Sequence, residues 1–338
     1  MAKLGEVCLL KAGKFVSAND ISPEYNKGLY PCFGGNGIRG YVADYTHDGE
    51  FPLIGRQGAL CGNVNLASGK FHATEHAVVV QPKIEMNVHW LYYAINAMNL
   101  GQYATGAAQP GLAVSKLETL SIEIPNISEQ NKIAQTLYKV EQLVNFRKQQ
   151  LAKLDELVKA RFVEMFGNKD YPRMKWNNVF NTTTGKLDSN AAVDNGKYPF
   201  FTCSKEPLKI DSYAFDQTAL LLAGNNAAGK YDVKYYQGKF NAYQRTYVLS
   251  LKHNWSYKLF QYQLEDKLLY LQTKSLGGLT KYLTLKILGE LDFIVPPLAL
   301  QNEFATFVAR IDQQKQTVQQ SLEKLELMRK ALMQEYFG

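Results

Sequence analysis

Residues 127–167 read ISEQNKIAQTLYKVEQLVNFRKQQLAKLDELVKARFVEMFG, and this stretch decides how the rest of the chain is organised. The same pattern returns without a gap at the end of the chain, because a shift of 171 positions superposes the two stretches. The chain is therefore a tandem duplication in which a helix-like run closes each half. Matching positions include Pro125 and Pro296, Gln130 and Gln301, Asn131 and Asn302, Lys153 and Lys324, and Phe166-Gly167 and Phe337-Gly338.

Apolar residues in both runs recur at alternating steps of three and four, which is the spacing of a coiled-coil seam. About 35 helical residues at ~1.5 Å each predict a rod roughly 50 Å long. Three charged residues interrupt the seams, namely Arg147, Lys315 and Arg329. They could set the register of the helices or contact a partner protein. The alternative is that their charged ends reach into solvent at the edge of the seam. The first seam is Ile133, Leu137, Val140, Val144, Leu151, Leu154, Val158 and Phe162, and the second is Phe304, Val308, Ile311, Val318, Leu322, Leu325 and Leu332.

Each apolar seam needs a cover, and the most direct cover for one run is the other. A segment of similar length precedes each run, so antiparallel pairing would place one segment at each end of the rod and give an internal pseudo-twofold repeat. We take this arrangement as the working model. The alternative is two ordinary amphipathic helices packed in a globular core.

The segments ahead of the two runs share the duplication and predict an α+β fold. Gly13-Lys14 matches Gly185-Lys186, and Gly69-Lys70-Phe71 matches Gly238-Lys239-Phe240. Each segment contains short β-like stretches, then a helical patch, a glycine-containing loop and a last strand. Ser128 is the expected N-cap of the first long helix. The predicted strands include 41–45, 51–54, 77–80, 219–222 and 246–251, the shorter helices are 89–98 and 257–271, and the domains are 1–125, 126–168, 169–296 and 297–338.

Composition indicates a globular protein without a membrane span. The chain has 338 residues, of which 46% are hydrophobic, and it contains no apolar run of roughly 18 residues. Its net charge of +7 resides mostly outside the two helix-like runs, which weakly favours a polyanionic partner. Four scattered cysteines favour reduced thiols in the cytoplasm and argue against a structural zinc site. They are Cys8, Cys32, Cys61 and Cys203.

Two glycine-rich stretches resemble cofactor loops, but their surroundings do not fit. Residues 33–37 match the FxGxG pattern of an S-adenosylmethionine loop, although the following residues predict a turn and strand rather than a helix. Residues 224–230 have P-loop spacing, yet Tyr231 follows Lys230 where a Ser or Thr would bind magnesium. The five histidines offer no HExxH motif. We therefore expect a non-catalytic binding protein without a cofactor or metal of its own.

Two variable α+β segments, each followed by a near-identical long helix, resemble the specificity (S) subunit of type I restriction-modification enzymes. The resemblance covers essentially the whole chain. It rests on Tyr30-Pro31, Gly37-Ile38-Arg39-Gly40-Tyr41, the Asp48-Gly49-Glu50 turn, the loop 55–64, and the repeated motif of Pro125, Gln130 and Asn131 with Pro296, Gln301 and Asn302.

This resemblance implies a role for each part. Each α+β segment would be a target-recognition domain that reads half of a bipartite site in double-stranded DNA. The helices would form an antiparallel coiled coil that sets the spacing and docks two methyltransferase (M) subunits and, where the complex carries a nuclease, restriction (R) subunits. S-adenosylmethionine and ATP are then expected on those partners. The Gln- and Lys-rich outward helix faces are the expected docking surface for the methyltransferase.

Base reading requires exposed side chains that donate and accept hydrogen bonds, such as Arg for guanine and Asn or Gln for adenine. Lysines are better suited to phosphates. The alternative for each residue is a solvated loop position or a turn-former. An alternative for the whole chain is a coiled-coil scaffold whose globular ends bind proteins, and a third is an enzyme acting on nucleotides through the two glycine loops. The candidate DNA-contacting residues are Asn36, Arg39, Arg56, Gln57, Asn63, Lys70, His72 and Gln109 in the first domain, and Lys205, Asn225, Asn226, Lys230, Tyr243, Gln244, Arg245 and Lys281 in the second.

Overall fold

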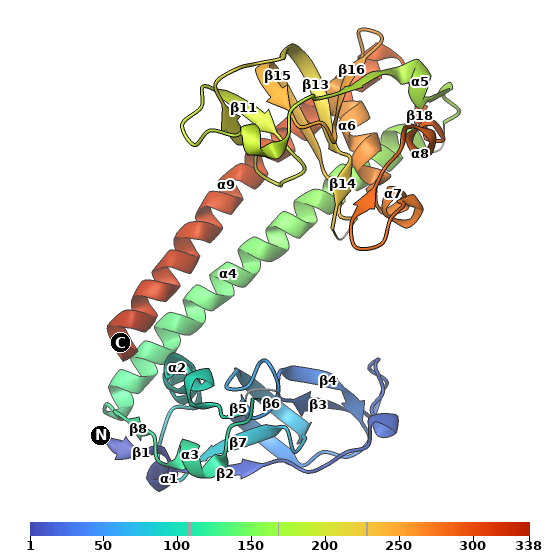
Figure 1. Cartoon of the computed structure of the whole chain (residues 1–338). Coiled ribbons are helices and arrows are strands. Elements are labelled where there is room, and N and C mark those ends of the chain that lie inside the picture. Colours follow the sequence, from blue (N-terminus) through green and yellow to red (C-terminus); the bar gives the residue numbers. More distant parts are fainter. Residues whose placement is uncertain (107–109, 168, 228) are drawn as a thin grey trace. The chain divides into compact units, whose positions relative to one another are not determined.

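A computed structural model describes residues 1–106, 110–167, 169–227 and 229–338, and these divide into two compact units (Figure 1). Unit 1 consists of Met1–Gln149 and Gln319–Gly338, and unit 2 is Gln150–Val318. Two long helices, α4 (Ile127–Phe162) and α9 (Leu298–Phe337), contribute to both units. No helix among the described residues is long and apolar enough to cross a membrane.

Unit 1 is built on a six-stranded sheet with the order β2-β7-β5-β6-β3-β4. All neighbouring strands are antiparallel except β3 and β6, which pair in parallel. The expected strands 51–54 and 77–80 are confirmed, and 41–45 overlaps the end of β4. The sheet comprises β2 (Cys8–Ala12), β3 (Tyr30–Gly34), β4 (Gly37–Val42), β5 (His47–Gly55), β6 (Val64–Ala73) and β7 (Ala77–Pro82).

The core of unit 1 lies on both faces of this sheet. Ile54 and Val78 point into the larger cluster with Trp90 and Leu91 of α2, whereas their neighbours Leu53 and Val79 point into a smaller cluster on the other face. This alternation is the two-residue period of a strand that is covered on both sides. The remaining elements are β1 (Ala2–Lys3), α1 (Leu4–Val7), η1 (Ala18–Asp20), α2 (Val88–Ala97), η2 (Leu100–Tyr103), α3 (Val114–Glu118) and β8 (Ser121–Ile122).

Unit 2 repeats this topology strand for strand, with the order β10-β16-β13-β15-β11-β12 and one parallel pair, β11 with β15. The strand expected at 246–251 is confirmed. The helix expected at 257–271 is two helices that meet at Lys267. Unit 2 contains β9 (Arg173–Lys175), α5 (Trp176–Val179), β10 (Phe180–Thr184), η4 (Ser189–Ala191), β11 (Tyr198–Phe201), β12 (Leu208–Ile210), β13 (Phe215–Ala223), β14 (Asn225–Asn226), β15 (Val233–Ala242), β16 (Thr246–Leu251), α6 (Tyr257–Asp266), α7 (Leu268–Lys274), β17 (Lys281–Tyr282), α8 (Leu285–Gly289) and β18 (Asp292–Ile294), and a π-helical turn, Val163–Gly167, ends α4.

The long helices pair antiparallel within each unit. In unit 1 the end of α9 packs against the start of α4, where Leu332 and Tyr336 join the core cluster that contains Leu137. In unit 2 the start of α9 packs against the end of α4, where Phe304 and Val308 join the cluster that contains Val158. The antiparallel pairing expected from the seams is therefore confirmed in both units.

The polar residues that interrupt the seams bond across the helix pair. Arg147 Nε donates to Ser321 Oγ at 3.2 Å, Lys315 forms an ion pair with Asp155, and Arg329 Nη1 lies 3.7 Å from Glu141 Oε1. Each contact joins one residue of α4 to one residue of α9. A shift of one helix along the other would break these contacts, so the interruptions help to fix the register.

A buried glutamine fixes each long helix to its own domain. Gln130 Oε1 accepts from the Asn87 backbone N–H at 3.0 Å, and its Nε2 donates to the Pro125 carbonyl at 2.8 Å. Gln301 makes the same two contacts, to the Ser256 N–H and the Pro296 carbonyl, at 3.0 and 2.8 Å. The repeated Pro-x4-Gln motif is therefore an architectural joint in both halves.

The N-cap of α4 differs from the expected residue. Asn126 Oδ1 accepts from the Glu129 backbone N–H at 3.0 Å, so Asn126 caps the helix and Ser128 lies inside its first turn. Both residues are favourable caps. The choice is made by Pro125, because the contact of its carbonyl with Gln130 starts the helix immediately afterwards.

Candidate nucleic-acid interface

Backbone hydrogen bonds join strand β3 and three connecting segments of unit 1, namely residues 56–63, 74–76 and 110–112. The Arg56 N–H donates to the His76 carbonyl at 3.0 Å, and the Thr74 N–H donates to the Phe33 carbonyl at 2.9 Å. The Leu112 N–H donates to the Arg56 carbonyl at 2.9 Å. These bonds give loops from distant parts of the sequence one shared surface.

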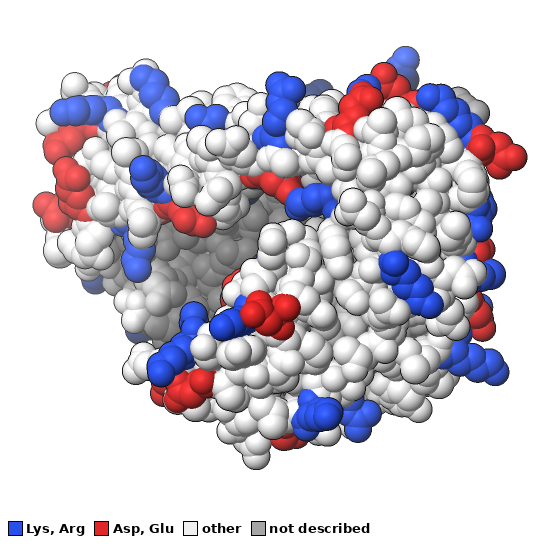
Figure 2. Space-filling view, turned by 90° about the horizontal axis from the view of Figure 1, so that it is seen from above, with Lys and Arg blue, Asp and Glu red and all other residues white. Residues whose placement is uncertain are grey.

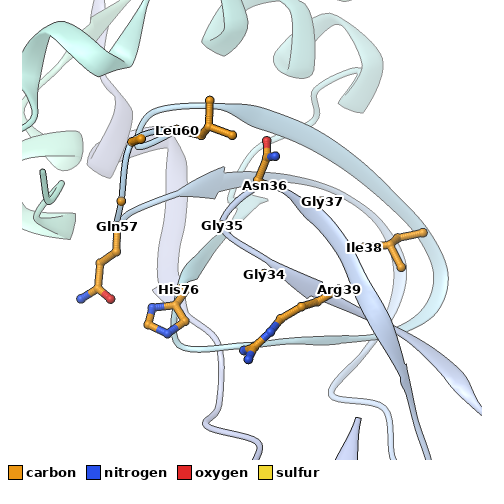
Figure 3. A pocket seen from close by; sticks show the side chains of 11 residues that line it. Gly34, Gly35, Asn36, Gly37, Ile38, Arg39, Gln57, Leu60 and His76 are labelled. Carbon is orange, nitrogen blue, oxygen red and sulfur yellow. The ribbon is translucent and has the colours of Figure 1, made fainter. Parts of the chain in front are cut away.

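This surface contains a shallow cavity of about 580 Å³ (Figure 3). Its floor includes Gly35, whose carbonyl lies so close to Gly55 that any side chain at Gly55 would overlap it. In Figure 3 the side chains of Arg39, His76 and Gln57 extend to one side of the cavity, whereas Asn36 and Leu60 lie at another. The cavity thus offers donors and acceptors of hydrogen bonds around a glycine floor, which permits close approach of a ligand.

The structure gathers four of the eight candidates of the first domain at or beside this cavity. Arg39, Gln57 and Asn36 line it, and Asn63 Nδ2 donates to Asn36 Oδ1 at 2.6 Å. Arg56 is half-buried, and its Nε has no hydrogen-bond partner among the described residues.

One other candidate of this domain, Lys70, stands apart from the cavity. Lys70 is exposed and does not line it, and its Nζ lies 4.7 Å from the centroid of the Tyr45 ring. Gln109 falls outside the described residues.

His72 is a correction to the expected set. Its side chain is only 8% exposed, and its Nε2 lies 3.2 Å from the Lys14 carbonyl. The matching position of unit 2 is Asn241, which is also buried and polar, because both residues pair with the parallel neighbouring strand in the same register. The position is buried in both repeats, although it holds His72 in one and Asn241 in the other, so His72 does not join the proposed DNA-contacting set.

Unit 2 holds its loops together at the corresponding places. The Gly224 N–H donates to the Arg245 carbonyl at 2.8 Å, and the Tyr243 N–H donates to the Phe201 carbonyl at 2.9 Å. In the third contact, the Leu283 N–H donates to the Gly224 carbonyl at 2.8 Å. Both units therefore present loops of different sequence on one common framework.

Several candidates of the second domain meet on this framework. Asn225 and Asn226 form β14 and pair with Tyr282 and Lys281 of β17, and Asn226 Oδ1 accepts from the Lys230 N–H at 3.3 Å. These pairings show that Asn225 and Asn226, within the glycine-rich stretch, form a short strand. Tyr243, Gln244 and Arg245 follow β15, with Gln244 Nε2 donating to Asp188 Oδ2 at 3.2 Å, and Lys205 lies exposed in the separate β11–β12 loop.

Sequence reasoning missed two residues that shape these surfaces. His76 lines the cavity of unit 1 and contacts Glu75 Oε1 through Nε2 at 3.2 Å. It corresponds to Arg245 of unit 2, so extending the repeat alignment by three residues beyond Ala73 and Ala242 would have identified it.

The second missed residue is Lys234 of unit 2, which donates to the Ser204 carbonyl at 2.9 Å and forms an ion pair with Asp232. No local motif signals Lys234, because it lies within a strand.

The charge pattern is mixed. Figure 2 shows Lys and Arg side chains spread over the visible face with Asp and Glu side chains among them. Such a surface attracts a polyanion only moderately, so discrimination would depend on individual hydrogen bonds and shape. Among the described residues, no cluster of three or more His, Cys, Asp or Glu side chains could hold a metal ion.

Comparison with protein families gives two matches to the type I restriction modification DNA specificity domain, over residues 1–156 and 168–327. The type I restriction enzyme EcoprrI specificity subunit of Escherichia coli is 52% identical over 143 residues, covering 42% of this chain and 36% of that protein. The EcoDI specificity subunit, also from Escherichia coli, is 33% identical over 171 residues, covering 48% of this chain and 37% of that protein. The chain thus matches little more than a third of the length of these curated relatives.

Two solved structures match almost the whole chain. A type I restriction-modification S subunit from M. genitalium superposes with a TM-score of 0.72 at 19% identity, covering 99% of this chain and 95% of that one. A second chain comes from a structure that describes complex assembly and conformational transition of the type I R-M system. It superposes with a TM-score of 0.53 at 13% identity, covering 99% of this chain and 96% of that one. At these identities the likeness establishes the fold, which is two α+β domains with two long helices.

Proposed function

Because the chain belongs to the family of type I restriction modification DNA specificity domains, we propose that each of its units reads one half of a bipartite target in double-stranded DNA. The observation that carries this proposal is the repetition of one strand order and one loop framework with different side chains on the loops. A common framework allows both units to approach DNA in the same way. Different side chains then allow them to select different bases.

The two loop surfaces offer different hydrogen-bonding groups. Unit 1 presents Arg39, Gln57 and Asn36 around its cavity, whereas unit 2 presents Asn225, Lys230 and Arg245. Arg pairs with guanine and amides pair with adenine in the major groove, whereas lysines are better suited to phosphates. The half-sites should therefore differ in sequence.

Catalysis is assigned to partner proteins in this proposal. The stretch with FxGxG spacing is the hairpin turn between β3 and β4, and the stretch with P-loop spacing contains β14, so neither opens a helix that could bind a phosphate or cofactor. S-adenosylmethionine and ATP would belong to methyltransferase and restriction subunits. The duplicated chain supports two methyltransferase subunits, one for each repeat, and a cytoplasmic location follows from a chromosomal DNA target.

The test is selection of bound DNA from a random duplex library by the full chain together with its methyltransferase. We expect a consensus of two short sequences separated by an unspecified gap, with an affinity that falls as salt rises. Replacing residues 1–125 by the corresponding domain of a relative should change only one half-site. Binding that ignores both sequence and salt would refute the proposal and favour a protein-binding scaffold.

The helix pair provides an independent test of spacing. Insertion of one heptad into each of α4 and α9 keeps both seams in phase and lengthens the pair by about 10 Å. This length corresponds to roughly three base pairs. The gap between the half-sites should grow while both half-sites keep their sequences. An unchanged gap would contradict the proposed role of the helices as a spacer.

A further inference from the structure

Unit 1 carries a surface cluster of two tyrosines and a lysine, formed by Tyr30, Tyr45 and Lys70. The rings of Tyr30 and Tyr45 meet edge to face, with their centroids 5.0 Å apart and an interplanar angle of 63°. Lys70 Nζ lies 4.7 Å from the centroid of the Tyr45 ring. The ammonium group of Lys70 is therefore held over an aromatic face.

Unit 2 repeats this cluster with the same residue types and the same geometry. The ring centroids of Tyr198 and Tyr213 are 5.1 Å apart at an interplanar angle of 62°, and Lys239 Nζ lies 4.7 Å from the centroid of the Tyr213 ring. Tyr198 begins β11, as Tyr30 begins β3, and these are the strands that form the parallel pair of each sheet. The two tyrosine–lysine clusters are thus equivalent by position.

The clusters lie on the surface, where the fold gives little reason to keep three identical side chains. Tyr45 and Tyr213 are 43% and 45% exposed, and both lysines are exposed. A cation held over an exposed ring stabilises a protein by only about 0.5–1 kcal/mol. A ligand that both units meet in the same way explains the repetition better than the stability of each unit does.

The chemistry of the clusters favours an anionic ligand. Neither Lys70 nor Lys239 forms an ion pair among the described residues, although Asp48 and Asp216 are their cross-strand neighbours. Each ammonium group can therefore donate to an anion. The ring beneath it restricts a flexible side chain in advance, so that less conformational entropy is lost when the anion binds.

The cluster of unit 1 lies beside the cavity rather than in it. Tyr30 and Gly34 are the two ends of β3, and Gly34 lines the cavity. Four steps along a strand at ~3.3 Å each separate them by roughly 13 Å. The major groove of DNA is about 12 Å wide. A unit whose cavity faces the bases in the groove would therefore bring the cluster close to the phosphates at the edge of that groove.

We propose that Lys70 and Lys239, each held over its tyrosine ring, bind phosphates of the DNA backbone in the same way at both half-sites. The backbone is common to the two half-sites whereas their bases differ, which matches identical clusters beside loops of different sequence. The inference rests on the proposed function and adds to it a contact in each unit that anchors the DNA without selecting bases.

The test measures the affinity of the full chain, with its methyltransferase, for a duplex selected by the wild type over a series of salt concentrations. Lys70→Gln and Lys239→Gln should each reduce the steepness of log affinity against log salt by about 0.9, and the double variant by about 1.8. At about 0.1 M salt this corresponds to an affinity loss of about eightfold for each single variant and about sixtyfold for both. The selected consensus should keep both half-sites, because phosphates carry no base information.

Three further variants separate the charge from the ring. Lys70→Arg keeps the positive charge and should keep the salt dependence of the wild type. Tyr45→Ala removes the ring but not the charge, so the affinity should fall about two- to fivefold with little change in the salt dependence. Lys27→Gln is the matched control, because Lys27 is an exposed lysine of unit 1 outside the cluster, and it should bind almost as the wild type does.

Several outcomes would overturn the inference while the proposed function stands. They are an unchanged salt dependence in Lys70→Gln and Lys239→Gln, a changed base in the consensus, or an equal loss of affinity in Lys27→Gln. Failure of the lysine variants to bind the methyltransferase in gel filtration without DNA would assign the clusters to a protein interface and would also overturn it. A wild type whose binding ignores both salt and sequence refutes the proposed function itself.

Discussion

Replacing Gln130 by methionine tests the joint between α4 and its domain. Methionine has almost the length and volume of glutamine, so Gln130→Met removes two hydrogen bonds without opening a cavity. It leaves the Asn87 N–H and the Pro125 carbonyl without their partner. Because Gln130 is 98% buried, water cannot easily replace it.

The expected magnitude follows from these two groups. Each of the two backbone groups left without a partner costs about 1–3 kcal/mol, so we expect a loss of about 2–6 kcal/mol in the free energy of unfolding of unit 1. For a domain of this size, each kcal/mol lowers Tm by roughly 2–4 °C. Gln301→Met should cost unit 2 at least as much, because Gln301 is completely buried.

Calorimetry of the full chain measures both effects. The unfolding transition that shifts in Gln130→Met is assigned to unit 1, and the transition that shifts in Gln301→Met is assigned to unit 2. Gln149→Met is the matched control, because Gln149 is exposed on the same helix. Its Tm should stay close to that of the wild type. If Gln130→Met unfolds within about 0.5 kcal/mol of Gln149→Met, the buried amide contributes little and the reasoning fails.

Three further variants or reactions test packing and burial. Gly185→Ala should lower the free energy of unfolding of unit 2 by at least about 3 kcal/mol in urea, because the new methyl group would overlap the Ala242 carbonyl. Gly278→Ala is the control, because its methyl group meets no neighbour, and it should leave the free energy of unfolding nearly unchanged. Tyr93→Phe should cost unit 1 about 1–2 kcal/mol, since it removes a buried hydroxyl that donates to Glu141 Oε2 at 2.8 Å, and a loss no larger than that of the exposed control Tyr25→Phe would contradict this. Burial raises the pKa of Cys8 to about 11, so this thiol remains protonated as pH rises until close to that value. At pH 8 iodoacetamide should therefore modify half-exposed Cys203 and spare Cys8 until the protein is denatured, and equal labelling of both by mass spectrometry would disprove the burial.

The architecture could be read from the sequence where one strong pattern dominated. The seams predicted the long helices, and the equal segments ahead of them predicted antiparallel pairing. The N-cap was missed because Asn126 and Ser128 are both suitable caps, and only the contact of Gln130 with the Pro125 carbonyl, which the structure reveals, decides between them. The break at Lys267 has no proline or glycine to signal it.

The candidate site could be predicted only in part, because exposure depends on strand pairing. Phe71, His72 and Ala73 are all buried in succession, which violates the alternation expected of a strand with one solvent face. The reason is that β6 leaves its antiparallel pairing with β5 at Phe71 and pairs in parallel with β3 from His72 onward. Composition identified loops rich in hydrogen-bonding groups, but the contact of Asn36 with Asn63 depends on the fold.

The repeated joints and the variable loops occupy separate parts of each half. Gln130 and Gln301 tie helix to domain, and Gly13 and Gly185 lie where no side chain fits, so substitutions at these places destroy the architecture. Residues such as Asn36 and Lys230 lie in exposed connecting segments that can vary without disturbing those joints. Evolution can therefore alter the target preference of one half through a few mutations while the other half keeps its own, and new combinations of half-sites become accessible without inventing a new protein.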